Sequence, residues 1–327
     1  MLRPLGSTPY RVSPIGLGLA ALGRPGYINL GHASDLDSTD VDAMQRRAHA
    51  LLSAAWEAGV RYFDAARSYG QAEAFLGSWL RDASPEPEGV VVGSKWGYTY
   101  TADWRADATT HEVKNHSLAT LGRQWSETQE HLSGFLNLYQ IHSATLETGV
   151  LEDEAVLARL GEIKAQGTAV GLSVSGPEQA LTIEQALRLE VNGAKLFDTV
   201  QATWNMLEPT AGNALRVARH EGVGVIVKEA LANGRLTRRN HEAAFAPKLE
   251  VLSRHAERLH TTPEALALAA ALQQLWADTV LSGAATAAQL RANLSALTVA
   301  WDDEAEQALA EFAEPDYWET RAALSWN

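Results

Sequence analysis

The sequence predicts a single α/β domain over residues 1–327, folded as a closed (β/α)8 barrel of the TIM type. Short apolar runs alternate with longer segments of helical periodicity along the whole chain, and no shift in composition marks a linker between domains. The length of 327 residues and the hydrophobic fraction of 46% are sufficient for the large core of such a barrel.

Eight short apolar runs, β-branched or flanked by glycine, are predicted as the strands. Strands that alternate with helices form a parallel sheet covered on both faces, and a closed barrel is the simplest sheet of that kind. In chain order the runs are Pro14–Leu19, Val60–Phe63, Gly89–Gly93, Asn137–Ile141, Ala169–Val174, Thr199–Ala202, Val223–Val227 and Thr279–Leu281.

The segments between these runs carry the signals of helices. Asp40–Ala58 has apolar residues at helical spacing and stops at Gly59, which suits the position after a helix C-terminus. Glu154–Ala165 follows the same pattern and ends before Gly167. Several of the other predicted helices start with Ser, Thr or Pro. They are Pro177–Leu189, Gly212–His220, Thr262–Ala277 and Thr286–Leu297.

Three stretches fall outside this repeat. Gly23–Ser38, rich in Gly, Asp and Ser, is predicted as a surface loop near the first strand, and we call it the N-terminal loop. The proline-rich Ser84–Gly89 is predicted as an ordinary loop before the third strand. Pro315–Asn327, which contains three aromatic residues, is predicted to fold back over the barrel, and we call it the C-terminal tail.

Charge and composition restrict the partners and the compartment. The net charge of −13 and the pI near 5.2 argue against binding to nucleic acid or an anionic membrane, because both repel an acidic protein. No run reaches the roughly 18 apolar residues of a membrane helix, and Met1–Tyr10 lacks the order of a signal peptide. We therefore expect a cytoplasmic protein that acts on a small molecule.

Metal and thiol chemistry are not expected. The chain has no cysteine, which excludes disulfides, thiol catalysis and cysteine-ligated metal. Two pairs of histidines, at 111 and 116 and at 255 and 260, are five residues apart, unlike the His-x-x-x-His arrangement of zinc sites. The sequence carries no signal for an oligomeric state.

Four polar residues stand at or just beyond the ends of predicted strands: Asp64, Tyr69, Lys95 and His142. Barrel enzymes place their chemistry at strand ends, because the strand fixes the backbone while the side chain faces a ligand. Any one of these residues alone is more commonly a helix cap, a rim aromatic or a core histidine. Four of them at three successive strands favour a shared site suited to proton transfer to a carbonyl.

This arrangement resembles the aldo-keto reductase superfamily, and the resemblance covers nearly the whole chain. It implies a catalytic tetrad of Asp64, Tyr69, Lys95 and His142. The ammonium of Lys95 would lower the pKa of the Tyr69 phenol from about 10, and Asp64 would hold Lys95 charged. His142, as a neutral donor, would bind the carbonyl oxygen of the substrate. Tyr69 would protonate that oxygen as a hydride arrives from a reduced nicotinamide.

The resemblance also implies which residues bind the nicotinamide cofactor. Ser173 and Gln201 match positions that hold the carboxamide, and Trp204 matches an aromatic residue that stacks on the nicotinamide. The stretch after the seventh strand resembles the loop that covers the pyrophosphate, and the stretch after the eighth resembles the adenosine-binding loop. The candidates in these two stretches are Lys228, Leu231, Asn233, Gly234 and Arg235, followed by Gly283, Gln289 and Asn293.

Two points about the cofactor have open alternatives. Gly283, Ala285 and Gln289 stand where NADPH-specific members often carry a cation for the 2′-phosphate, so NADP(H) and NAD(H) are both candidates. Arg291 would supply that cation only if it turned toward the ribose. Lys228 departs from the usual residue at its position and is either a direct phosphate ligand or a partner of Glu229.

The expected function is an NAD(P)(H)-dependent oxidoreductase that interconverts an aldehyde, ketone or aldose with an alcohol. The alternatives are an NAD-linked sugar or polyol dehydrogenase, a non-catalytic nicotinamide-binding sensor subunit, and a barrel with unrelated chemistry. The N-terminal loop, Gly97–Thr110 and the C-terminal tail are expected to set substrate selectivity. The aromatic residues Trp96, Tyr98, Tyr100 and Trp104 form either loop packing or a substrate wall.

Overall fold

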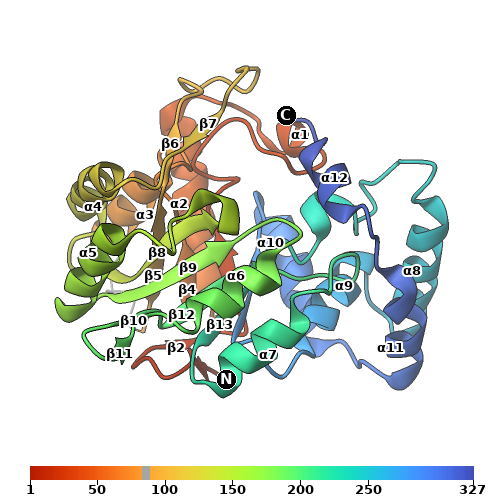
Figure 1. Ribbon diagram of the computed structural model, residues 1–327. Helices are drawn as coiled ribbons and strands as arrows, with labels where there is room; N and C mark the ends of the chain where they lie inside the picture. Colours follow the sequence, from red (N-terminus) through yellow and green to blue (C-terminus); the bar gives the residue numbers. More distant parts are fainter. Residues whose placement is uncertain (83–88) are drawn as a thin grey trace.

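The computed structural model describes residues 1–82 and 89–327, so Ser84–Glu88 of the predicted proline-rich loop lie outside the described residues. Eight parallel strands close into a barrel in the order β3-β4-β5-β8-β9-β12-β13-β14, and β14 pairs with β3. Helices surround this barrel (Figure 1). The predicted (β/α)8 barrel is therefore confirmed.

All eight predicted strands are present. β9 matches its predicted range residue for residue, whereas β5 begins and ends later than predicted and β8 is longer at both ends. Lys95 and His142 consequently lie within the last residues of their strands. The barrel strands are β3 (Ile15–Gly18), β4 (Tyr62–Asp64), β5 (Val91–Trp96), β8 (Leu136–Ala144), β9 (Ala169–Val174), β12 (Thr199–Thr203), β13 (Gly224–Lys228) and β14 (Thr279–Ser282).

The six predicted helices are also present, most of them shorter than predicted. The side chains of Asp40, Thr262 and Thr286 accept hydrogen bonds from backbone amides in the first turns of their helices, as the capping signals indicate. The prediction did not include α3, α4 and α8. The helices are α2 (Val41–Glu57), α3 (Ala72–Asp82), α4 (Leu118–Leu132), α5 (Glu154–Ala165), α6 (Gln179–Ala186), α7 (Gly212–His220), α8 (Ala246–Arg258), α9 (Pro263–Leu272) and α10 (Ala287–Leu294).

One predicted helix end is wrong for a clear reason. The helix predicted over Thr262–Ala277 ends at Leu272, and the chain then makes tight turns, in which Ala277 donates to the carbonyl of Gln274, before it enters β14. The apolar composition continues past Leu272, so the sequence pattern alone shows no stop there. None of the helices among the described residues is long and apolar enough to cross a membrane.

A short hairpin closes the N-terminal end of the barrel. β1 (Arg3–Pro4) pairs with β2 (Arg11–Val12), and Leu5 and Val12 pack against Tyr62 and other side chains that fill the barrel interior. Gly93 leaves room for that tyrosine, because a Cβ there would stand 2.5 Å from the Tyr62 hydroxyl. With this end closed, the other end of the barrel is where a cavity can form.

The other end carries three segments that are distant in the sequence. The hairpin of β6 (Tyr98–Tyr100) and β7 (Glu112–Lys114), the short helix α1 (His32–Asp35) and the C-terminus lie near one another in Figure 1. Two further strands, β10 (Glu190–Val191) and β11 (Ala194–Lys195), form a hairpin elsewhere. The C-terminal region contains α11 (Asp303–Leu309) and α12 (Tyr317–Ala322).

The C-terminal tail folds back over the barrel, as predicted. Asn327 and Tyr27 exchange two backbone hydrogen bonds of 3.0 and 3.1 Å, which joins the end of the chain to the N-terminal loop. The prediction of a simple surface loop over Gly23–Ser38 is wrong, because residues 23–26 are buried and α1 forms within the stretch. Gly23 packs so closely that a Cβ would stand 2.1 Å from the Tyr69 carbonyl oxygen.

Candidate functional site

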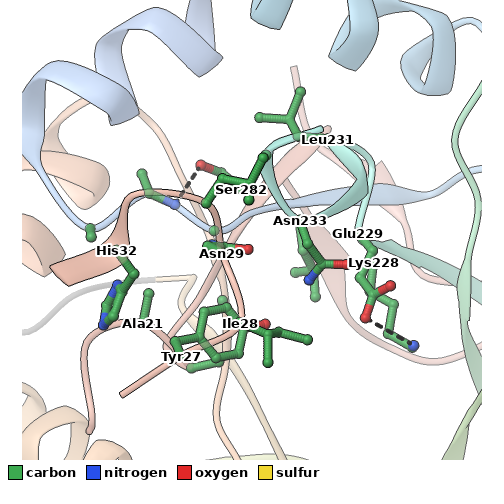
Figure 2. A pocket seen from close by; sticks show the side chains of 18 of the residues that line it. Ala21, Tyr27, Ile28, Asn29, His32, Lys228, Glu229, Leu231, Asn233 and Ser282 are labelled. Atoms are coloured by element: carbon green, nitrogen blue, oxygen red, sulfur yellow. Dashed lines mark hydrogen bonds and ion pairs between the residues drawn. The ribbon is translucent and has the colours of Figure 1, made fainter. Parts of the chain in front are cut away.

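A cavity of about 550 Å³ lies at the carboxyl ends of the barrel strands. This size and place are typical of small-molecule sites in barrels. Its walls come from strand ends, from the N-terminal loop and from the C-terminal tail. Figure 2 shows Tyr27 and His32 of the N-terminal loop on one side, and Lys228, Glu229 and Asn233 on the other.

A buried ion pair between Lys95 and Asp64 lies beneath the cavity. The ammonium of Lys95 donates to the Asp64 carboxylate and, at 3.0 Å, to the carbonyl of Ala65. The other carboxylate oxygen of Asp64 accepts from the Tyr62 hydroxyl and from the Gln201 amide, each at 3.0 Å. Both charged groups are almost fully buried, so this network of partners offsets the cost of removing them from water.

Tyr69 and His142 lie above this ion pair. Their rings meet edge to face with centroids 5.5 Å apart, and the Lys95 ammonium lies 5.0 Å from the centre of the Tyr69 ring. Asp64, Tyr69 and His142 line the cavity, and Lys95 supports them from below. The structure thus brings the four predicted catalytic residues together.

Burial determines the protonation states of Tyr69 and His142. It raises the pKa of Tyr69 well above its ordinary value, and the charge of Asp64 adds to this effect, whereas Arg24 opposes it. Burial likewise lowers the pKa of His142, with further lowering by Lys95, Lys228 and Arg24. The expectation that Lys95 brings the pKa of Tyr69 below 10 is therefore corrected: burial dominates, and the ammonium of Lys95 is paired with Asp64.

Arg24 is a site residue that the sequence analysis missed. Its guanidinium carbon lies 5.2 Å from the centre of the Tyr69 ring and 4.6 Å from that of Trp326. It donates to the Ser68 carbonyl at 2.9 Å and to Glu112 at 2.8 Å. Arg24 belongs to the N-terminal loop, and only the fold brings this loop and the tail together beside Tyr69. No local sequence signal could therefore have identified it.

The aromatic residues after β5 divide between the two predicted alternatives. Tyr98 lines the cavity with its ring centroid 5.0 Å from that of His142, so it forms part of a substrate wall. Trp96 is fully buried against His116, and the indole of Trp104 donates to the carbonyl of Thr39. These two tryptophans are loop and core packing.

Of the three residues predicted to bind the nicotinamide end of the cofactor, one lines the cavity and two do not. Gln201 lines the cavity, but Ser173 is buried and accepts a hydrogen bond from the amide of Ser143 at 2.8 Å. The structure does not bring Trp204 to the cavity. Its ring packs against Trp276, with centroids 5.7 Å apart, and both tryptophans line a second cavity.

The loop after β13 lines the cavity through Leu231, Asn233 and Gly234. Ala232, Asn233 and Gly234 all have positive φ angles, and the amides of Ala232 and Gly234 donate within the loop, to the carbonyls of Glu229 and Leu231. The buried side-chain oxygen of Asn233 has no hydrogen-bond partner among the described residues. Arg235 points elsewhere and pairs with Glu314 at 2.7 Å.

Lys228 and Glu229 belong to a buried charge cluster. The Lys228 ammonium donates to the Thr203 hydroxyl at 2.9 Å and lies 3.9 Å from the Glu229 carboxylate. Figure 2 marks the ion pair between Lys228 and Glu229 with a dashed line. Arg321 of the tail contacts both carboxylate oxygens of Glu229, at 3.1 and 3.0 Å from its Nε. Burial acts to raise the pKa of Glu229, but Arg321 and Lys228 lower it to about 2. Burial lowers the pKa of Lys228 to about 8.

Gly283, Gln289 and Asn293 line the part of the cavity next to α10. Asn293 donates to the Ser282 hydroxyl at 2.8 Å, and Gln289 accepts from the amide of Ala285 at 2.8 Å. Arg291 is exposed and does not line the cavity. The structure therefore brings most of the predicted cofactor candidates to the cavity that also contains the tetrad.

A parallel barrel with a buried Asp–Lys pair beneath a tyrosine and a histidine defines a class of barrel proteins suited to carbonyl chemistry. The family model described as "Aldo/keto reductase family" matches residues 14–314. The chain therefore belongs to the aldo/keto reductase family, whose members are oxidoreductases that use nicotinamide cofactors.

Curated relatives have moderate identity to this chain. Pyridoxal 4-dehydrogenase from Microbacterium luteolum is 30% identical over 43% of this chain and 42% of its own length. L-glyceraldehyde 3-phosphate reductase from Escherichia coli K12 is 26% identical over 86% of this chain and 85% of its own. The chain spans about half the length of several relatives, including 55% of the aldo-keto reductase ausK of Aspergillus calidoustus.

A solved structure shares the fold. The holo form of an aldo-keto reductase from Bacillus halodurans has a TM-score of 0.73 at 21% identity, with 96% of each chain covered.

Proposed function

We propose that this chain is an NAD(P)(H)-dependent oxidoreductase that interconverts a small carbonyl compound and an alcohol, with Tyr69 as the general acid or base. The observation that carries the proposal is the shared position of Tyr69 and His142 in one cavity, above the buried Asp64–Lys95 pair. The relatives named as a pyridoxal dehydrogenase and a glyceraldehyde phosphate reductase support the same class of substrate.

The residues present fit a nicotinamide dinucleotide. One cavity connects Tyr69 to α10, and Leu231, Asn233 and Gly234 of the loop after β13 line it between these two ends. The unpartnered oxygen of Asn233 is a buried polar atom that a ligand would satisfy. Gln201 would hold the nicotinamide end, the loop the pyrophosphate, and Gln289 and Asn293 the adenosine end. When bound, the reduced cofactor supplies the hydride.

The residues of the tetrad then have distinct tasks. The raised pKa of Tyr69 keeps its phenol protonated, which is the form that donates a proton to a carbonyl oxygen. The lowered pKa of His142 keeps its imidazole neutral, so it can donate one hydrogen bond and fix the angle of that oxygen. The Lys95 ammonium beneath the phenol stabilises negative charge on the tyrosine oxygen during proton transfer.

A Tyr69→Phe variant tests this proposal. Loss of the proton donor should lower turnover by about 10²- to 10⁴-fold. Binding of NADH and NADPH, followed by quenching of tryptophan fluorescence, should be retained, because Trp326 lines the cavity and the phenyl ring keeps the packing. Tyr10→Phe, in the N-terminal part of the chain and outside the cavity lining, is the matched control with full activity.

Two results would contradict the proposal. Full activity of Tyr69→Phe would show that the Tyr69 hydroxyl is not the proton donor. Failure of the unaltered protein to bind either dinucleotide would remove the source of hydride and favour a barrel with unrelated chemistry.

The second candidate is an NAD-linked sugar or polyol dehydrogenase that works in the direction of oxidation. The observation that favours it is the lack, among the described residues next to α10, of a cation free to bind a 2′-phosphate. A tighter complex with NADH than with NADPH, together with faster alcohol oxidation than carbonyl reduction, would support this candidate.

A further inference from the structure

We propose that Asp35 makes this site select NAD(H) over NADP(H), by holding a carboxylate where the additional phosphate of NADP(H) would have to bind. The inference rests on the proposed function and deepens it. It concerns a residue of the N-terminal loop, in which the sequence analysis identified no candidate.

The position of Asp35 follows from the shape of the cavity. Tyr69 and His142 lie at one end, and Ala285, Ala288 and Gln289 of the α10 region line the other. A dinucleotide with its nicotinamide beside Tyr69 therefore has its adenosine ribose near α10. Asp35 lines the cavity at this second end.

Three contacts hold the Asp35 side chain in place. Arg239 binds it with both terminal nitrogens of its guanidinium, at 2.7 and 2.5 Å, and the amide of Gln289 donates to it at 2.9 Å. The side chain is only 10% exposed. Burial acts to raise the pKa of Asp35, but the hydrogen bonds from Arg239 and Gln289 bring it below its ordinary value. A fixed negative charge therefore stands at the ribose end.

The charges around Asp35 do not offer a place for a phosphate. Four of the described residues that line the cavity are cations, and three of them contact or lie near Tyr69 and Glu229: Arg24, Lys228 and Arg321. Arg239 remains, and its guanidinium is bound to Asp35 and to the carbonyl of Gly31. Glu264 adds a second carboxylate to this end of the cavity.

The two cofactors meet this arrangement differently. A ribose 2′-hydroxyl donates a hydrogen bond, and the carboxylate of Asp35 accepts such a bond while it remains paired with Arg239. A 2′-phosphate carries about two negative charges and would have to displace Asp35 from Arg239 while remaining next to it. This repulsion is the physical basis of the preference for NAD(H).

The test compares dissociation constants for NADH and NADPH, measured by quenching of tryptophan fluorescence, in the unaltered protein, in two variants of the Asp35–Arg239 pair and in a control variant. The unaltered protein should bind NADH at least about ten-fold more tightly than NADPH. Asp35→Asn should shift this ratio toward NADPH by about ten-fold or more, because it removes the charge and frees Arg239. Arg239→Gln should shift it in the opposite direction, because it leaves the carboxylate without its cation.

Asp37→Asn is the matched control. Asp37 lies two residues further on, has a 98% exposed side chain and pairs with Arg47 outside the cavity lining, so its loss should leave the ratio unchanged. The proposal is overturned if the unaltered protein binds NADPH more tightly, or if Asp35→Asn and Arg239→Gln leave the ratio as it is. Binding of neither dinucleotide would instead show that the proposed function itself fails, and this inference with it.

Discussion

At the scale of single residues, Arg24 is the cation that opposes the effect of burial and of Asp64 on the pKa of Tyr69. The charge of Lys95 is largely matched by Asp64, whereas Arg24 lies 5.2 Å from the Tyr69 ring centre and opposes the rise in the pKa of the phenol. Glu112 and the Ser68 carbonyl hold Arg24 in this place. We infer that Arg24 positions and tunes Tyr69 without itself being the proton donor.

Arg24→Gln should therefore affect the two directions of the reaction differently. Removing this cation raises the pKa of Tyr69 further, so the phenolate needed for alcohol oxidation forms at higher pH and the pH profile of oxidation shifts upward. Carbonyl reduction uses the protonated phenol and should change less. The measurement is the pH profile of kcat in both directions.

The controls separate charge from packing. Arg24→Lys keeps the positive charge, so its pH profile of kcat should be close to that of the unaltered protein. Arg105→Gln removes an exposed arginine outside the cavity lining and should leave the profile unchanged. A pH profile of oxidation that is identical in Arg24→Gln and the unaltered protein would refute the tuning role.

At the scale of elements, close approach of α3 and α4 fixes part of the helical layer outside the barrel. Gly77 of α3 lies against the backbone of α4, where an added Cβ would stand 2.1 Å from the carbonyl oxygen of His131. That carbonyl also accepts a hydrogen bond from Arg81 at 2.8 Å. The backbone of α4 cannot move away without losing this contact, so only glycine fits at position 77.

Gly77→Ala should destabilise the protein by about 1–3 kcal/mol, because it forces the two helices apart. Gly122→Ala is the matched control on α4, where an added Cβ would have no described atom within 4 Å. That change should be neutral or stabilise the helix by up to about 1 kcal/mol. Chemical denaturation measures both free energies of unfolding; equal values for the two variants would contradict the close packing.

At the scale of the whole molecule, the N-terminal loop and the C-terminal tail meet over the cavity. The backbone hydrogen bonds between Tyr27 and Asn327 join the N-terminal loop to the tail, and Trp326 stacks on His111 with centroids 4.0 Å apart. The ion pair between Glu229 and Arg321 anchors the tail to the end of β13. The cavity is therefore completed by residues that are nearly 300 positions apart in the sequence.

Arg321→Gln should loosen the tail and lower the free energy of unfolding by about 3 kcal/mol, because it leaves the buried Glu229 with hydroxyl donors and with Lys228, 3.9 Å away, in place of a contacting guanidinium. Since Arg321 helps to lower the pKa of Glu229 to about 2, the stabilisation by this pair is complete above pH 4.5 and lost as pH falls through 2. In the Arg321→Gln variant, the free energy of unfolding should therefore fall much less between pH 4.5 and pH 2. Denaturation at a series of pH values measures it.

The exposed pair of Arg258 and Asp302 provides the control for this prediction. Arg258 contacts both oxygens of Asp302, at 2.7 and 2.8 Å, but the pair is at the surface. Arg258→Gln should leave the free energy of unfolding nearly unchanged, because solvent screens an exposed ion pair. A loss of stability in Arg321→Gln no larger than in Arg258→Gln would mean that the tail is not held by this pair.

Several features were predictable because they depend on local patterns. The strands and their order follow from short apolar runs between helical segments, and Asp64, Lys95 and His142 lie together because parallel strands end at the same side of a barrel. Gln289 and Asn293 were expected at the site from the family resemblance of the stretch after the eighth strand, and both line the cavity. Trp204 shows the limit of this reasoning, since its match to a motif did not bring it to the cavity.

The sequence by itself determined the barrel and the grouping of the tetrad, because both follow from periodicity and from strand ends. Only the tertiary structure decided that Arg24, Asp35 and Arg321 share their cavity, since the N-terminal loop and the C-terminal tail carry them there through contacts distant in the sequence. It also decided the direction of the pKa of Tyr69, because burial and the charges around a phenol are properties of the packed molecule.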